Sequence, residues 1–427
     1  MLDIELLRKE TARITDLLRR KNFTGSMDEL LAMDSRRREA ITAFEGKRAE
    51  QKKLSKEIGA MMARKQSPGE LKAVADKIAA EIKDLEAMAE ILKSELAKAL
   101  LFIPNIPDDD VPISPDESGN RVLAVWGVQR AFDFEPKTHW DLGAASGMLD
   151  LTLGATLAGS GFYVLKGDLA KLERSLIDFM IGLHTSKHGY TEIATPFLAR
   201  EEVMVGTGQL PKFAEDMYKI EGEPLYLIPT AEVTLANSFR ETILREDELP
   251  KYVCGYTPCF RKEAGASGRD TRGMIRVHQF SKVELIKVVH PERSSDELEK
   301  LVDEACDVLR QLGIPHRRVL LSTGDMSFSS AKTVDLEVWC PGVGKWLEVS
   351  SCSNCRDYQA RRMQTRFRQA DGKGNKFVHI LNGSGVALPR LMIAIIENYQ
   401  EPDGRIRLPE AMLKYFDGRT HIGGAER

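Results

Sequence analysis

The chain has 427 residues, which suggests two or three domains on a prior of about 150 residues each. Its 61 Lys and Arg against 64 Asp and Glu leave a net charge of −3, which excludes a histone-like protein held to nucleic acid by bulk charge. No apolar stretch approaches the ~20 residues that span a bilayer, and the acidic N-terminus has no apolar signal-peptide core. With six sparse cysteines, we expect a cytoplasmic protein without a membrane partner.

Residues 1–102 contain no Trp or Tyr and are dense in Leu, Ala, Lys, Arg and Glu. Apolar residues recur there at helical spacing, clearest in the series Leu71, Val74, Ile78, Ile82, Leu85, Met88, Leu92 and Leu96. Pro68-Gly69 separates this stripe from a rougher one upstream. The pattern predicts two antiparallel helices over about 27–101, a coiled-coil arm about 55 Å long at 1.5 Å per residue.

Basic residues gather on the first helix of this arm. They are Arg36, Arg37, Arg38, Lys47, Arg48, Lys52, Lys53 and Lys56. They are typical of a solvated coiled-coil surface with ion pairs between helices, or of a face that contacts the phosphates of a large nucleic acid. The arm alone leaves both interpretations open.

A proline-rich segment, 103–112, follows and reads as a linker, because its prolines prevent a continuous helix. From 113 to 427 the chain mixes helices and strands without a regular alternation of the two. A helix is expected over Asp168–His184, and strands over 191–196, 225–228, 252–260, 275–290, 334–338, 346–349 and 377–381. The sequence predicts an α+β fold, in which an antiparallel sheet is flanked by helices and the helical arm precedes it.

The most informative stretch runs from Phe260 to Glu284 and reads as strand, glycine-rich charged loop, strand. One face of the second strand would present Arg276, His278, Phe280, Lys282 and Glu284. A guanidinium, a ring and a carboxylate in one row suit a nucleotide, although a solvated strand face is the alternative. No phosphate-binding P-loop or dinucleotide fingerprint is present, and the Cys352-x-x-Cys355 pair has no second pair, so no structural zinc is expected.

This stretch resembles motif 2 of the class II aminoacyl-tRNA synthetases, and nearly the whole chain resembles the seryl-tRNA synthetase family. Asp168–His184 with the strand ending at Pro196 is similar to motif 1, and 381–400 to motif 3. The runs Thr207–Phe213 (TGQLPKF), Pro229–Thr234 (PTAEVT) and Trp346–Asn354 (WLEVSSCSN) also resemble family segments. The resemblance implies a ligase that activates L-serine with ATP and transfers it to the 3′ end of tRNA(Ser).

For ATP, the resemblance implies two catalytic arginines, Arg261 on the α-phosphate and Arg390 on the γ-phosphate. Phe280 would stack on adenine with Glu263 beside its amino group, and Glu348 and Ser351 would hold Mg²⁺. The full set of expected ATP-binding residues is Arg261, Lys262, Glu263, Arg276, Val277, Phe280, Glu348, Val349, Ser350, Ser351 and Arg390.

For serine, the resemblance implies a pocket of Thr230, Ala231, Glu232, Arg261, Glu284, Asn382 and Ser384. It also implies that the arm grips tRNA(Ser) through the basic residues named above, and that two chains form a homodimer through motif 1. Two alternatives stay open: a synthetase-like enzyme that loads a non-tRNA carrier, and an inactive coiled-coil interaction protein. A different amino-acid specificity is a third, against which the Thr230-Ala231-Glu232 match argues.

Overall fold

The computed structural model describes residues 1–264 and 272–423. Most of the predicted motif 2 loop, residues 265–271, therefore lies outside the described residues. The chain forms two compact units: a smaller one of Leu2–Arg19 and Phe23–Pro104, and a larger one that contains Asn105–Arg427 together with Met1 and Arg20–Asn22.

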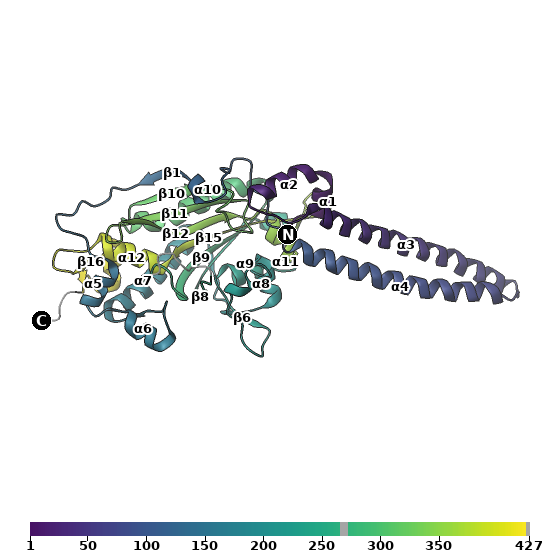
Figure 1. The fold of residues 1–427 in the computed structure, drawn as a ribbon, viewed down its shortest axis with the longest axis horizontal. Helices are drawn as coiled ribbons and strands as arrows, with labels where there is room; N and C mark the ends of the chain where they lie inside the picture. The colour runs from purple at the N-terminus through teal and green to yellow at the C-terminus, as the bar shows by residue number, and fades with distance from the viewer. Residues whose placement is uncertain (265–271, 424–427) are drawn as a thin grey trace. The chain divides into compact units, whose positions relative to one another are not determined.

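The smaller unit is helical throughout. Two short helices, α1 (Ile4–Lys9) and α2 (Thr11–Arg20), precede α3 (Met27–Ala63, 37 residues) and α4 (Gly69–Leu100, 32 residues). Figure 1 shows α3 and α4 running side by side in opposite directions, which confirms the predicted hairpin. The side chain of Ser26 caps α3 by accepting a hydrogen bond from the amide of Glu29.

The seam between α3 and α4 follows a heptad spacing on α4. The residues that are buried or half-buried there are Leu71, Ala75, Ile78, Ile82, Leu85, Ala89, Leu92 and Leu96, at alternating steps of four and three. Val74 and Met88, which the sequence pattern assigned to this stripe, are instead 47% and 51% exposed. Two alanines take their places, because small side chains also fit the knobs-into-holes packing between adjacent helices.

The larger unit is built on an eight-stranded sheet. Its strand order is β1-β10-β11-β12-β15-β9-β8-β4, and every neighbouring pair is antiparallel except β4 with β8. The strands are β1 (Arg121–Trp126), β10 (His316–Leu320), β11 (Lys332–Cys340), β12 (Lys345–Asn354), β15 (His379–Ala387), β9 (Gln279–Val289), β8 (Lys251–Phe260) and β4 (Thr191–Glu192). The predicted antiparallel α+β fold is confirmed.

Three helices cover one face of this sheet: α7 (Gly167–Ser186), α10 (Ser294–Gln311) and α12 (Leu388–Asn398). Successive side chains of β9 point to opposite faces of the sheet, so the strand contributes both to the core and to the cavity. Val283 and Leu285 belong to the large apolar core with these helices. Lys282 and Glu284 point to the opposite face and line a cavity, so the pleat separates core from site.

Shorter elements complete the larger unit. The helices are α5 (His139–Ala145), α6 (Leu151–Ala158), α8 (Glu201–Thr207), α9 (Glu232–Asn237) and α11 (Tyr358–Met363). The strands are β2 (Leu149–Asp150), β3 (Val164–Leu165), β5 (Leu198–Arg200), β6 (Leu225–Leu227), β7 (Ile243–Arg245), β13 (Arg366–Arg368), β14 (Asn375–Phe377), β16 (Ile406–Arg407) and β17 (His421–Ile422). Among the helices of the described residues, none is long and apolar enough to cross a membrane.

Several predicted strand boundaries are wrong. The strand expected over 191–196 forms only at Thr191–Glu192, and the one expected over 377–381 falls across the end of β14 and the start of β15. The second strand of the motif 2 segment was expected from residue 275, whereas β9 begins at Gln279. Met274, Ile275 and Val277 precede it and are buried, so their apolar character reflects packing of an irregular segment rather than strand alternation.

Candidate active site

A cavity of about 750 Å³ opens on the face of the sheet opposite α7, α10 and α12. Its floor comes from β9, β12 and β15, and its walls from segments that precede β9, follow β10 and begin α12. Thirteen residues predicted from the sequence line it: Thr230, Glu232, Arg261, Glu263, Arg276, Val277, Phe280, Glu284, Glu348, Val349, Ser351, Asn382 and Ser384. Arg390 lines it as well, so both predicted catalytic arginines share one cavity.

Arg261 lies directly after β8, where the strand ends at the cavity. Its Nε donates a hydrogen bond to the carbonyl oxygen of Pro229 at 3.2 Å, and its guanidinium carbon lies 5.1 Å from the centre of the Phe280 ring. Stacking on an aromatic face while one edge is hydrogen-bonded fixes a guanidinium plane. The remaining N–H groups are thereby oriented for an anion.

Arg276 and Glu263 form an ion pair in the same cavity as Arg261. Arg276 Nη1 is 3.3 Å from Glu263 Oε2. Glu263 adopts a left-handed backbone conformation with a φ of 50°, which is uncommon for a residue other than glycine. Such conformations cluster at functional sites, and here one turns the chain out of β8 towards the cavity.

Arg390 lies in the first turn of α12, which begins at Leu388 and also has Pro389 in that turn, where proline is tolerated. Its Nη1 donates to the carbonyl oxygen of Glu348 at 2.7 Å and lies 3.3 Å from Glu348 Oε2. Its Nε donates to the carbonyl oxygen of Ile275 at 3.2 Å. This arginine therefore connects the segments that resemble motifs 2 and 3 with the EVSS segment.

Glu348 and Ser351 face the cavity together because of a β-bulge. They are three residues apart, and in a regular strand an odd separation would place them on opposite faces. The pairing of β11 with β12 shifts by one residue between these positions, so that Ser351 lies opposite Asp335 and Glu348 lies opposite Glu337. The bulge brings a carboxylate and a hydroxyl, both hard oxygen donors, to one face.

The serine-binding candidates meet around Lys282. Its Nζ lies 2.5 Å from Glu284 Oε2 and donates to Thr230 Oγ1 at 2.8 Å, while the Thr230 hydroxyl donates to Glu284 Oε2 at 3.3 Å. Ser384 lies opposite Glu284 in the pairing of β15 with β9. The sheet thus gathers an ammonium, a carboxylate and two hydroxyls within one corner of the cavity.

Glu232 forms the second acidic position of this corner. Its Oε1 accepts hydrogen bonds from Gln359 Nε2 at 2.6 Å and from Asn382 Nδ2 at 3.1 Å. Burial, followed by the nearby Glu284 carboxylate, raises the pKa of Glu232 to about 7. Two carboxylates so placed suit a bound ammonium group, which would favour the ionised form of Glu232.

Three predicted site residues do not line the cavity with their side chains. Ala231 is fully buried, Lys262 points towards the ring of Tyr218, and the Ser350 hydroxyl bonds to the Ser384 carbonyl oxygen. Ser350 lies opposite Leu336, on the other side of the β12 pleat from Ser351. His278, which belongs to the charged row of the predicted strand, does not line the cavity either. Its ring contacts Phe162 and forms a hydrogen bond with the carbonyl oxygen of Arg261.

Sequence reasoning did not assign Lys282 or Gln359 to the site. Lys282 belonged to the alternating row on the predicted strand, so the signal was present in the pattern. Gln359 is fully buried and also donates to the carbonyl oxygen of Thr207. Its role depends on long-range packing of α11, for which the sequence carries no local sign.

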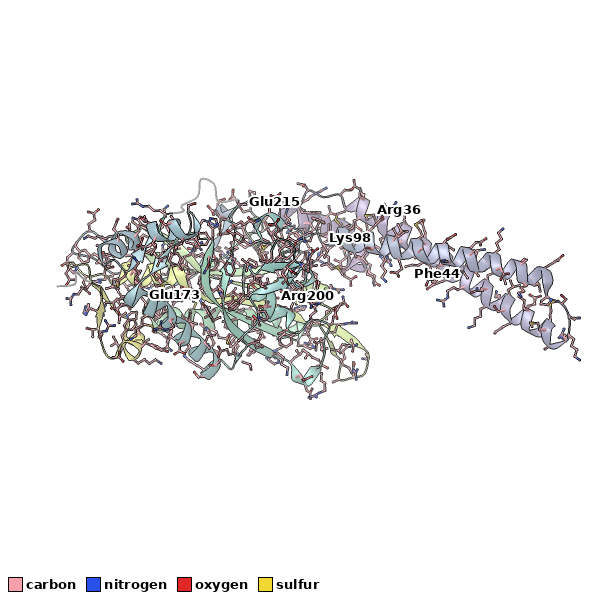
Figure 2. The ribbon with its side chains drawn as sticks, turned by 90° about the horizontal axis from the view of Figure 1, so that it is seen from below. Arg36, Phe44, Lys98, Glu173, Arg200 and Glu215 are labelled. Atoms are coloured by element: carbon pink, nitrogen blue, oxygen red, sulfur yellow. The ribbon has the colours of Figure 1, made fainter. Side chains whose placement is uncertain are left out.

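The predicted tRNA-binding residues of the arm differ in their surroundings. Arg37 and Arg38 pair with the fully buried Asp34, and Lys47 pairs with Glu50 and Glu81. Arg48 lies over the ring of Phe44. Arg36 is exposed, as is Lys98 on α4 (Figure 2). Lys52, Lys53 and Lys56 are exposed too, and they form no ion pair with any residue that the structure describes.

Comparison with known proteins assigns the family. Residues 1–107 match the model of the seryl-tRNA synthetase N-terminal domain, and residues 217–399 match that of the tRNA synthetase class II core domain (G, H, P, S and T). The serine--tRNA ligase of Thermomicrobium roseum is 50% identical over 99% of this chain and 95% of its own length. The chain belongs to the seryl-tRNA synthetase family.

Solved structures of the family agree in fold. The crystal structure of seryl-tRNA synthetase from Pyrococcus horikoshii complexed with ATP is 36% identical, covers the whole of both chains and superposes with a TM-score of 0.93. That of the Naegleria fowleri enzyme in complex with AMP is 30% identical, covers 100% of this chain and 99% of that one, and gives 0.88. These matches do not favour a carrier-loading enzyme or an inactive coiled-coil protein.

Proposed function

We propose that this chain carries out the two-step reaction of its family: serine and ATP give seryl-adenylate and pyrophosphate, and the seryl group then passes to the 3′-terminal ribose of tRNA(Ser). The observation that carries the proposal is the convergence of Arg261 and Arg390 on one cavity that also holds Thr230, Glu232 and Glu284. The two guanidinium groups suit a triphosphate, and the carboxylates of Glu232 and Glu284 in the same cavity suit the ammonium group of an amino acid.

In the first step the serine carboxylate attacks the α-phosphorus and pyrophosphate leaves. The nucleophile is already ionised at neutral pH, so no general base is required. The protein must hold the reactants in line and offset charge at the phosphate. We assign Arg261, held by Phe280 and Pro229, to the α-phosphate, and Arg390 to the γ-phosphate.

The adenine is assigned to the Phe280 ring, with the Glu263 carboxylate accepting from its amino group. Arg276, which is paired with Glu263, and Val277 lie at the same wall of the cavity. Lys262, Val349 and Ser350 remain in the proposed ATP set through their backbone groups, because the side chains of Lys262 and Ser350 point elsewhere.

Serine is assigned to the corner formed by Thr230, Glu232, Glu284, Asn382 and Ser384, with Ala231 packed behind it. Carboxylates there suit the ammonium group, and the hydroxyl and amide groups suit the side-chain hydroxyl. A site built to bond a hydroxyl discriminates against the analogue that lacks it by about 10⁴–10⁵. Alanine should therefore be rejected at this corner.

The donor set at Glu348 and Ser351 fits Mg²⁺, which prefers hard oxygen ligands. Among the described residues, no group of three or more His, Cys, Asp or Glu side chains is arranged to hold a metal ion. Phosphate and water oxygens would therefore complete the coordination. When bound, the cation supplies charge neutralisation at the phosphates.

The arm is assigned to tRNA, with domain divisions at 1–102, 103–112 and 113–427. Its exposed basic residues on α3, in particular Lys52, Lys53 and Lys56, suit phosphate contacts, whereas Arg37, Arg38 and Lys47 are already paired with carboxylates. Glu81 and Glu50 beside Lys47 make that position the weakest candidate.

A homodimer through motif 1 and a cytoplasmic location complete the proposal. The motif 1 proline, Pro196, is followed by Phe197 and Leu198, which are 43% and 41% exposed. Large apolar side chains at a surface suit a subunit contact.

All six cysteines are free and buried, in keeping with a reducing compartment.

Pyrophosphate exchange with each of the twenty amino acids, with and without tRNA, tests the proposal. We expect exchange to depend on serine and Mg²⁺ and not to require tRNA. Exchange driven by another amino acid, or by none, would overturn the assignment of the pocket.

A further inference from the structure

Three carboxylates share the cavity face of the β11–β12 hairpin. Asp335 and Glu337 are two residues apart on β11 and so point to the same side, and they lie opposite Ser351 and Glu348 of β12. Glu337 pairs with Arg317, and Glu348 pairs with Arg390. Asp335 has no cationic partner among the residues that the structure describes.

Asp335 is also the buried member of this row. It is 8% exposed, and its Oδ1 has no hydrogen-bond partner within the described part of the chain. Ser351 lies directly opposite Asp335 in the pairing of β11 with β12. Native proteins rarely leave a buried carboxylate oxygen unpaired, so this atom indicates a group that belongs to the working site.

We propose that Asp335 is a positioning residue for the magnesium site, and this inference rests on the proposed function because Glu348 and Ser351 are themselves assigned there. In this arrangement the Asp335 carboxyl group accepts a hydrogen bond from the Ser351 hydroxyl. The lone pairs of Ser351 Oγ are then free to bind the cation, and rotation of the hydroxyl group is restricted. Partners behind a metal ligand in this way orient it and raise its donor strength.

The test measures Mn²⁺ binding to the full-length protein with a non-hydrolysable ATP analogue, by electron paramagnetic resonance of the free ion. We expect D335N to raise the Mn²⁺ dissociation constant at least about tenfold, the effect typical of losing such a partner. Metal-free binding of the analogue and the unfolding midpoint should change little. Wild-type Mn²⁺ affinity in D335N would overturn the inference while leaving the Glu348–Ser351 site in place.

Two further variants make the result specific. E337Q removes a carboxylate from the same strand and face whose charge Arg317 already offsets, so it should change Mn²⁺ affinity less than about twofold. An equal loss in E337Q and D335N would indicate general electrostatics and contradict a positioning role. If D335N does not fold, D335S replaces it.

A double-mutant cycle with S351A tests whether Asp335 acts through Ser351. In the S351A background we expect D335N to cost less than about twofold, because the hydroxyl to be oriented is gone. A full tenfold cost there would overturn the proposed route. If wild-type protein binds no Mn²⁺ that depends on Glu348, the metal assignment in the proposed function fails together with this inference.

Discussion

The arm and the cavity each contain a Lys–Glu pair, and the two pairs differ in their surroundings. On the arm, Lys47 Nζ lies 2.9 Å from Glu81 Oε2, and the two side chains are 36% and 38% exposed. In the cavity, Lys282 Nζ lies 2.5 Å from Glu284 Oε2, and the side chains are 7% and 3% exposed. Water screens the first pair and is excluded from the second.

The difference separates charges that keep a surface soluble from charges that carry chemistry. An exposed pair costs little to form and contributes little when formed. A buried pair persists only because its members also bond to neighbours, as Lys282 does to Thr230. Substitutions in the cavity should therefore have larger effects than substitutions of exposed pairs on the arm.

The largest effect is expected at Arg261. Arg261→Ala removes the guanidinium that Phe280 and Pro229 hold in place, and serine-dependent pyrophosphate exchange should fall about 10³-fold or more, as for loss of a preorganised charge donor. Arg245→Ala is the matched control, because Arg245 is exposed and its ion pair within the described part of the chain is with Asp247, close by in sequence. Near-normal exchange in Arg261→Ala would remove this residue from the site.

The next effect is on stability, at Lys282. Lys282→Met leaves Glu284 buried without its ammonium partner, and the free energy of unfolding in urea should fall by about 3 kcal/mol. Glu284→Gln in the same background should recover part of that loss, since the unpaired charge is then absent. A loss below about 1 kcal/mol would mean that the cavity pair behaves like a surface pair.

A moderate effect is expected from pH through Glu232. Its pKa of about 7 means that the carboxyl is largely protonated at pH 6 and ionised at pH 8. Below pH 7, the KM for serine should therefore decrease about tenfold for each unit by which the pH is raised. The reason is that the ammonium group of serine needs the ionised form of Glu232. Glu232→Gln should flatten this dependence, and a KM that rises with pH would contradict it.

The same shift has a consequence for the free protein. The unfolded chain ionises this carboxyl near pH 4.3, whereas the folded chain keeps it protonated to about 7. Glu232 should therefore lower the free energy of unfolding as pH rises through that window. Thermal melts of the wild type and Glu232→Gln across this range measure the difference.

The smallest effect is expected for the arm pair. Lys47→Met should change the free energy of unfolding by less than about 1 kcal/mol, because both partners are exposed and screened. Added salt should reduce even that difference. A loss as large as that of Lys282→Met would contradict the link between burial and effect.

Local patterns accounted for the arm and for much of the sheet. The helices and the break near Pro68 follow from spacing that each helix carries in its own sequence. The prediction placed Val74 and Met88 in the seam because it favoured large apolar residues, although Ala75 and Ala89 occupy those heptad positions. The periodicity thus predicted where the helices lie, but it did not predict correctly which side chains pack between them.

The cavity could be predicted only in part. The residues that resemble family motifs lie together in it, but their partners depend on register. A bulge aligns Glu348 with Ser351, and the Lys282–Thr230 bond joins two distant segments. Burial of Asp335 and the position of Gln359 also follow from tertiary packing, so no local pattern reveals them.

In the proposed division of labour, the cavity performs the chemistry and the arm holds the tRNA. Lys47 and Glu81 face each other across the hairpin, so replacing residues 48–80 with a short glycine-rich turn should shorten the arm and leave its base closed. Serine-dependent pyrophosphate exchange and tRNA charging are then measured on the same preparation. We expect exchange to stay within about twofold of wild type and charging to fall about 100-fold or more, as when several phosphate contacts are lost. Charging that falls no further than exchange would contradict it.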